Sequence, residues 1–211
     1  LSKFAIPHLK SFIFDDNPLN SKQLKSFADF LNRQKKLILL SVNRSIPASS
    51  GTESISRFLN AIKESAIQHL FIQADVSGHF NIGPNINSFL HDILFDNKLT
   101  SLDISYQELG EEGVDFLIEL IHTTSIENLW FDEISVPDFA SMLHLCTEIL
   151  NSKLKYAKYP SKELNMLAYQ DEVKTEMIVR SIHDSTSNMT IEVKIGRSPS
   201  FDNCQIRTNI A

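Results

Sequence analysis

The sequence LTSLDISYQELGEEGVDFLIELIHTTSIENLWF, residues 99–131, holds one complete unit of a strand and a helix and the start of the next unit. Its first part alternates apolar and polar residues, which predicts a short strand with Leu102 and Ile104 facing inward and Asp103 facing out. The segment VDFLIELI has apolar residues at the three- and four-residue spacing of an amphipathic helix. The closing IENLWF repeats the first pattern, so we expect a second strand beside the first.

The same frame recurs along the chain, which makes an internal repeat the main feature of the sequence. Six copies of the pattern L-x-x-L-x-L-x-x-N-x-L begin 27 to 32 residues apart. The first, fourth and sixth positions of every copy are apolar or aromatic: Leu9, Phe12, Phe14; Leu37, Leu40, Val42; Ile67, Leu70, Ile72; Leu99, Leu102, Ile104; Ile126, Leu129, Phe131; and Leu154, Ala157, Tyr159. Each copy buries only one edge of itself, so neighbouring copies must stack to complete a common core.

Helices are predicted between the strands. Apolar spacing predicts them within residues 24–31, 55–62, 86–94, 114–121 and 139–150, with start signals at Ser21, Thr52, and Pro137 followed by Asp138. The Gly-, Asn- and Pro-rich segment 76–87 is predicted to be a loop. After a helix-like segment at 165–183, MTIEVKIG at 189–196 alternates at period two, which predicts a strand that caps the open end of the stack. The last stretch, 197–211, has no clear pattern.

Residues 99–131 resemble the ribonuclease-inhibitor type of leucine-rich repeat, down to the Leu-Gly-acidic-acidic-Gly-Val turn at 109–114 that opens the helix. The resemblance covers about residues 1–183. It implies an α/β leucine-rich-repeat solenoid of about six right-handed strand–helix repeats with a parallel sheet on the concave face, followed by a capping strand and tail at 184–211. The ninth position of each copy, usually Asn or Cys in this family, matches only at Asn17. Less regular turns are therefore expected later, particularly around Ile134 and Lys162.

Composition excludes several classes of function. The chain has 211 residues, is 42% hydrophobic, and carries 26 acidic against 20 basic residues, a balance unsuited to nucleic acid. No uncharged apolar run is long enough to span a membrane. The two cysteines, Cys146 and Cys204, cannot make a disulfide framework. We therefore expect a soluble protein in a reducing compartment, cytoplasmic or secreted into a host cytosol.

The sequence contains no pattern that favours catalysis. Phosphate-binding, nucleophile-elbow and zinc-protease motifs are missing from the sequence, and its seven histidines are scattered without metal-ligand spacing. Cys146 lies on the apolar side of a predicted helix, where a buried thiol is expected rather than a reactive one. We therefore predict that the protein is not an enzyme and uses no cofactor or metal.

The outward strand positions and the turns after them define a candidate binding surface. It combines large aromatic residues with neighbouring acids: Phe71, Asp103, Tyr106, Trp130, Asp132, Glu133 and Tyr156. Exposed Trp and Tyr are frequent interface anchors, and an acidic rim favours a protein or peptide partner with a basic surface. The alternative is that Trp130 and Tyr156 are covered by the C-terminal tail or pack sideways on neighbouring strands.

Two functions follow from the resemblance and from this surface. The first is a protein–protein interaction module that binds through the concave sheet face, as in a bacterial effector acting inside a host cell. The second is a regulatory repeat domain of a larger signalling protein, because similar repeats occur in GTPase-activating proteins and in nucleotide-driven receptors. An enzyme would need a pocket with converging polar groups, for which the sequence has no signal.

Overall fold

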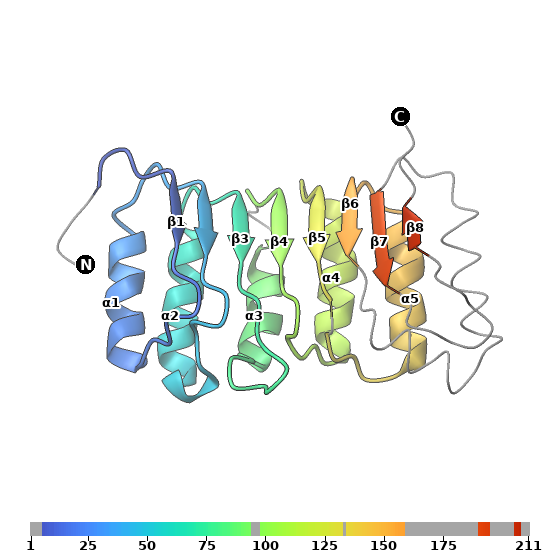
Figure 1. Ribbon diagram of the computed structural model, residues 1–211, viewed down its shortest axis with the longest axis horizontal. Helices are drawn as coiled ribbons and strands as arrows, with labels where there is room; N and C mark the ends of the chain where they lie inside the picture. The colour runs from blue at the N-terminus through green and yellow to red at the C-terminus, as the bar shows by residue number, and fades with distance from the viewer. Residues whose placement is uncertain (1–5, 94–97, 133, 159–189, 195–204, 208–211) are drawn as a thin grey trace.

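The structure is an α/β arrangement in which the strands of one open sheet alternate with helices (Figure 1). The computed structural model describes residues 6–93, 98–132, 134–158, 190–194 and 205–207. The strands are β1 (Ser11–Ile13), β2 (Leu39–Ser41), β3 (His69–Phe71), β4 (Ser101–Asp103), β5 (Asn128–Trp130), β6 (Tyr156–Lys158), β7 (Thr190–Lys194) and β8 (Gln205–Arg207). The helices are α1 (Ser21–Leu31), α2 (Thr52–Lys63), α3 (Pro84–Ile93), α4 (Glu111–Thr123) and α5 (Phe139–Leu150), with a short 3-10 turn, η1 (Ala48–Ser50), before α2.

The order of the strands in the sheet follows their order in the chain. Strands β1 to β7 are parallel, and β8 pairs antiparallel with β7. Leu70 pairs with Leu102, and Leu102 pairs with Leu129, so the same position of each copy lies side by side. The predicted frame and the predicted strand within 189–196 are confirmed. Strand β8 lies in the stretch for which the sequence has no clear pattern.

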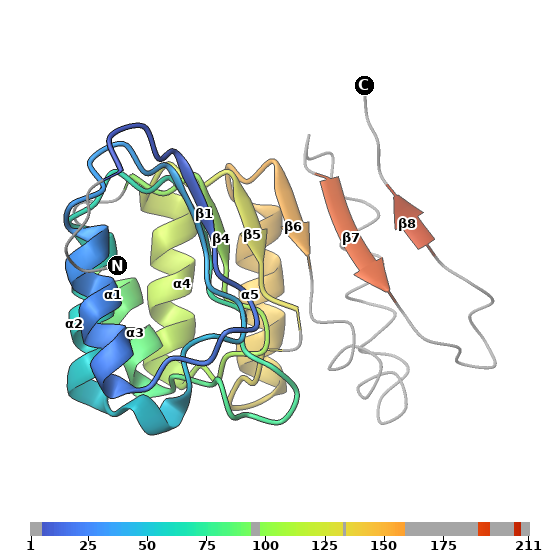
Figure 2. The same ribbon diagram turned by 60° about the vertical axis from the view of Figure 1, so that its left-hand side comes forward.

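The described helices cover one face of the sheet only (Figures 1 and 2). Leu102 and Ile104 point into the core between the two layers with 0% exposure, as predicted. Asp103 stands between these two residues and therefore faces the opposite side, since side chains alternate along a strand. We call that side the helix-free face: the side of β1–β6 that no described helix covers (Figure 2). Phe12 and Phe14 are only partly buried, because β1 stands at the edge of the sheet.

The helix starts have local causes. In α1 the side chain of Asn20 accepts from the Gln23 N–H at 3.0 Å, and Gln23 accepts from the Asn20 N–H at 2.9 Å, so the two residues form a capping box. Asp138 caps α5 as predicted. Ser21 and Thr52 are instead the first helical residues, one position after their caps. Pro84 opens α3, so the predicted loop 76–87 ends at Gly83.

The turns after β2 and β4 have Ser45 and Gln107 at the ninth position, where Asn17 stands in the first copy, and both side chains bind backbone groups. The hydroxyl of buried Ser45 accepts from the Asn17 N–H at 3.1 Å and donates to the Phe14 carbonyl at 2.6 Å. Gln107 is also buried and bonds two backbone groups of the preceding copy, the Ile82 N–H at 3.1 Å and the Ile72 carbonyl at 2.8 Å.

The described residues next to Ile134 continue the pattern of the preceding copy. Ile134 is fully buried, and a parallel bridge joins the next residue, Ser135, to Glu108 of the preceding copy. Lys162 lies outside the described residues, as does the predicted helix at 165–183. Within the described part of the chain, no helix is both long and apolar enough to cross a membrane.

Candidate functional site

Three aromatic side chains gather on the helix-free face, and we call Phe71, Trp130 and Tyr156 the aromatic cluster. The ring centroids of Phe71 and Trp130 are 5.5 Å apart, and those of Trp130 and Tyr156 are 5.1 Å apart. Strand β4 lies between β3 and β5, so the rings of Phe71 and Trp130 must lean toward each other above β4. All three residues are half-buried. Trp130 and Tyr156 thus pack sideways on a ring of a neighbouring strand, which is the alternative given for them, and their role in binding stays a prediction.

Asp103 occupies the strand position between two of these rings. It pairs in the sheet register with Phe71 on one side and with Trp130 on the other. One carboxylate oxygen, Oδ1, accepts from the Ser105 N–H at 2.9 Å. Burial raises the pKa of Asp103 above its ordinary value, and the hydrogen bonds from Ser105 and the charge of Lys158 oppose that rise. The aromatic cluster thus surrounds a carboxylate that is poorly hydrated.

Asp132 differs from its prediction as an acid at an exposed rim. It is buried, with 8% exposure, and its Oδ2 lies 2.8 Å from the Nζ of Lys158. Its backbone N–H also donates to the Ser105 hydroxyl at 3.1 Å. The sequence frame places Asp132 correctly after β5 but cannot predict this burial, because the burial depends on a lysine that the following repeat supplies.

Tyr106 lies at the end of the β4 turn, in the left-handed backbone region with φ of 65°. Asp16 and Arg44 occupy the same eighth position in their copies and have φ of 58° and 51°. The Tyr106 N–H donates to the Asp132 carbonyl at 2.9 Å. The turn therefore holds Tyr106 at the carboxyl edge of the sheet, next to Asp132. Glu133, the remaining predicted site residue, lies outside the described residues.

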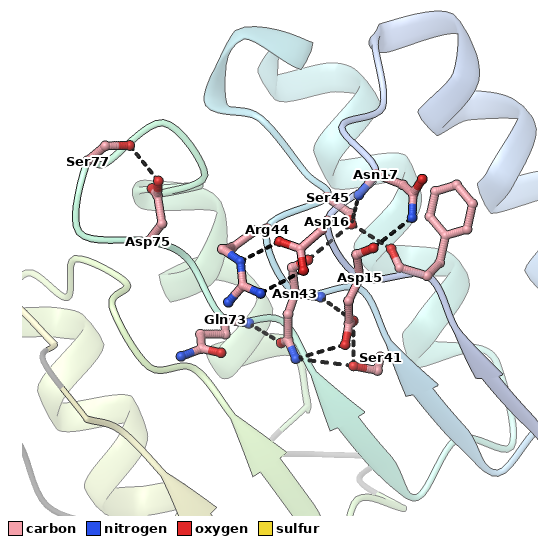
Figure 3. A network of polar contacts seen from close by, with 11 residues as sticks. Asp15, Asp16, Asn17, Ser41, Asn43, Arg44, Ser45, Gln73, Asp75 and Ser77 are labelled. Atoms are coloured by element: carbon pink, nitrogen blue, oxygen red, sulfur yellow. Dashed lines mark hydrogen bonds and ion pairs between the residues drawn. The ribbon is translucent and has the colours of Figure 1, made fainter.

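A second polar group lies at the carboxyl ends of β1–β3 (Figure 3). The Oδ1 of Asp15 accepts from the Asn43 N–H at 2.9 Å, and the Oδ1 of Asn43 accepts from the Gln73 N–H at 2.9 Å. The side chains of Asp15 and Asn43, both at the seventh position of their copies, thus bind the backbone of the next copy. These hydrogen bonds indicate a structural role in the stacking of the copies. The sequence signal for this role is the polar residue that recurs at the seventh position of successive copies, as at Asp15, Asn43 and Gln73.

Charged residues lie beside this polar group at the carboxyl ends of β1–β3. The guanidinium of Arg44 makes two contacts with the carboxylate of Asp16, at 2.6 and 2.7 Å, and these raise the pKa of Arg44. The Oδ2 of Asp75 accepts from the Ser77 hydroxyl at 2.5 Å, while its buried Oδ1 has no hydrogen-bond partner among the described residues. Figure 3 shows the Asp75 loop beside Arg44. Because Arg44 is already paired with Asp16, this edge presents little uncompensated positive charge.

The helix side of the molecule brings two histidines to one carboxylate, which the scattered sequence positions did not predict. The Nε2 of His122 lies 2.8 Å from Glu148, and the Nδ1 of His144 lies 3.9 Å from it. Across the described part of the chain, no group of three or more His, Cys, Asp or Glu residues is arranged to hold a metal ion. Cys146 is buried, which raises its pKa to about 12 and leaves it a neutral thiol at physiological pH.

A hollow of about 310 Å³ lies at the β1 end of the structure, bordered by the following residues: Phe14, Leu19, Lys22, Gln23, Ser26 and Phe27. Its surface is mainly apolar, and Lys22 is its single titratable group. Such a lining lacks the converging polar groups of a catalytic pocket.

No protein-family model matches the sequence, and a search of curated proteins found no match. The functional proposal therefore rests on the sequence pattern, the fold and the side-chain geometry.

Proposed function

We propose that the chain is a leucine-rich-repeat solenoid of the long-repeat, ribonuclease-inhibitor-like class, with about six right-handed repeats and the sheet on its concave side. The repeat period of 27 to 32 residues supports this class. A register that aligns equivalent residues across β1–β6 supports it as well. A third observation is that the eighth position has a left-handed backbone conformation in three of the copies, at Asp16, Arg44 and Tyr106.

We propose further that the protein is an interaction module, acting in the cytoplasm or in a host cytosol, that binds another protein through its helix-free face. The observation that carries this proposal is the aromatic cluster, in which three large rings remain half-exposed on the one sheet face that the described helices leave open. Such rings bury a large area at low entropic cost and are common centres of protein interfaces. Asp103 and Asp132 give this face acidic character beside the rings.

The test begins with capture of a partner from native or host cytosol, followed by its purification. Binding to the purified partner is then measured by calorimetry for the wild type and for the double variant Phe71→Ala/Trp130→Ala. We expect the double variant to weaken binding by about 2 kcal/mol or more, which is roughly thirtyfold in Kd. His144→Ala is the matched control, because His144 is exposed on α5, on the helix side.

The wild type offers a direct second measurement. Trp130 is the only tryptophan of the chain, so its fluorescence reports on the aromatic cluster alone. A partner that binds there should change the emission of Trp130 with the same Kd that calorimetry gives. Equal affinity of the double variant and the wild type, together with unchanged Trp130 emission on binding, would exclude the helix-free face as the interface.

A further inference from the structure

The helix-free face has more acidic than basic charge next to the aromatic cluster. Asp132 is paired with Lys158 at 2.8 Å. Asp103 receives a hydrogen bond from the Ser105 N–H but belongs to no ion pair among the residues that the structure describes. Asp103 is half-buried, and the charge of Lys158 acts on it although no ion pair joins the two among the described residues. A desolvated carboxylate of this kind costs free energy that a bound cation can offset.

The rings beside Asp103 are suited to the same kind of ligand. A cation within about 6 Å of an aromatic ring is attracted by the negative charge of the ring face, and Trp is the strongest of the aromatic residues in this respect. Trp130 lies next to Asp103 in the register and is flanked by Phe71 and Tyr156. The two residues are therefore neighbours across β4 and β5, which favours one cationic group that contacts both.

Among protein cations, the guanidinium group fits this pair better than an ammonium group. It is planar, so it can stack on an indole ring, and its edge carries several N–H donors for a carboxylate. Lysine has a compact and strongly hydrated charge, which loses more on entering a partly dry site. The nearby Lys158 forms its ion pair with Asp132, at 2.8 Å, and acts on Asp103 only through its charge.

We propose that the helix-free face binds an arginine side chain of a partner peptide, with the guanidinium stacked on Trp130 and its N–H groups donating to Asp103. This inference rests on the proposed function of the face and adds the chemical class of the group that it recognises. Arginine is the anchor, and the remainder of the partner contributes contacts around it.

The experiment uses blocked pentapeptides with the sequence Gly-Ser-X-Ser-Gly, where X is arginine, lysine or citrulline. Citrulline has nearly the shape of arginine but no charge. Titration is followed by the fluorescence of Trp130. We expect the arginine peptide to bind saturably, the lysine peptide to bind several-fold more weakly, and the citrulline peptide to bind at least about tenfold more weakly.

Variants separate Asp103 from the general acidity of the chain. Asp103→Asn should weaken binding of the arginine peptide by at least about tenfold. Glu119→Gln removes the same charge from an exposed position on α4 and should leave the affinity unchanged. Because burial raises the pKa of Asp103, the affinity of the wild type should fall with decreasing pH earlier than for an ordinary aspartate. Thermal melts of both variants establish that they remain folded.

The outcomes distinguish this inference from the proposed function. Equal binding of the arginine and citrulline peptides, no saturable change with any of them, or full affinity in Asp103→Asn would overturn the arginine proposal. If a purified partner still loses binding in the Phe71→Ala/Trp130→Ala variant, the interaction surface itself stands. If that partner binds the double variant normally, the proposed function fails independently of the peptide result.

Discussion

Gly113 of α4 lies against Asn87 of α3, and replacing Gly113 by alanine tests how closely the two helices pack. Gly113 is buried in the first turn of α4, against the side chain of Asn87 from α3. A Cβ atom at Gly113 would lie 2.8 Å from the Asn87 Cγ and in still closer contact with its Oδ1. Because the clash reaches Cγ, the whole amide group must move rather than its tip alone.

The magnitude follows from two opposing effects. Replacing a helical glycine by alanine ordinarily stabilises a helix by about 0.5 to 1 kcal/mol. Overpacking of a buried contact costs about 1 to 3 kcal/mol. We therefore expect Gly113→Ala to lower the free energy of unfolding by about 1 kcal/mol in the wild-type background. In the Asn87→Ala background the clash is gone, so the same substitution should raise the free energy of unfolding by up to about 1 kcal/mol.

The measurement is urea unfolding of the wild type, both single variants and the double variant. Far-UV circular dichroism and Trp130 fluorescence are recorded together, because coincident transitions are needed for a single free energy. The four values form a double-mutant cycle with an expected coupling of about 2 kcal/mol. If Gly113→Ala is stabilising on its own, or has the same effect in both backgrounds, then close contact with Asn87 is not the reason for glycine at this position.

Three further predictions concern the core, the carboxylate of Asp103 and the turn that contains Gln107. Leu102→Ala should cost about 2 to 5 kcal/mol of unfolding free energy, whereas Ile13→Ala, at a position 67% exposed, should change it by less than about 0.5 kcal/mol in the same urea assay. The pKa of Asp103 in the folded protein is raised above 3.8, so the contribution of Asp103 to stability falls as the pH rises from 3.8 through that pKa. Asp103→Asn should therefore gain stability relative to the wild type over this range and keep the gain at pH 7. Melting temperatures of both proteins, measured against pH, check this. Gln107→Leu leaves two buried backbone groups without partners and should cost about 2 kcal/mol or more, and a loss below about 0.5 kcal/mol in chemical unfolding would contradict the role assigned to this side chain.

The arrangement of the strands could be predicted because it depends on a period. Leu102 and Ile104 face inward and Asp103 faces out, since alternation in a strand is a local rule. The same periodic frame brought Phe71 and Trp130 to one sheet face, although they are 59 positions apart in the sequence. The ends of the helices were predicted less well, because Asn20 and Gly51 cap their helices from positions just before the sequence signals.

Contacts between neighbouring copies could not be predicted from the frame. The burial of Asp132 depends on Lys158, and the turns depend on Ser45 and Gln107 taking over hydrogen bonds expected of Asn. These substitutions depend on side-chain length and on the exact offset between two turns, neither of which a repeat pattern encodes. Strand β8 is three residues long and pairs only with β7, so it leaves no periodic signal.

The ion pairs between α1 and α2 illustrate a mechanical consequence of the stack. The ion pairs Lys25–Glu53 at 2.8 Å and Asp29–Arg57 at 2.6 Å each join residues 28 positions apart. The main packing contacts of the strands and helices likewise join an element to its counterpart in the next repeat. Tension applied to the two ends would therefore pass through the repeats in series. Each repeat that detaches would release roughly 100 Å of extended chain. A single-molecule pulling experiment should accordingly record a sawtooth force–extension curve, in which each small step corresponds to the unfolding of one repeat.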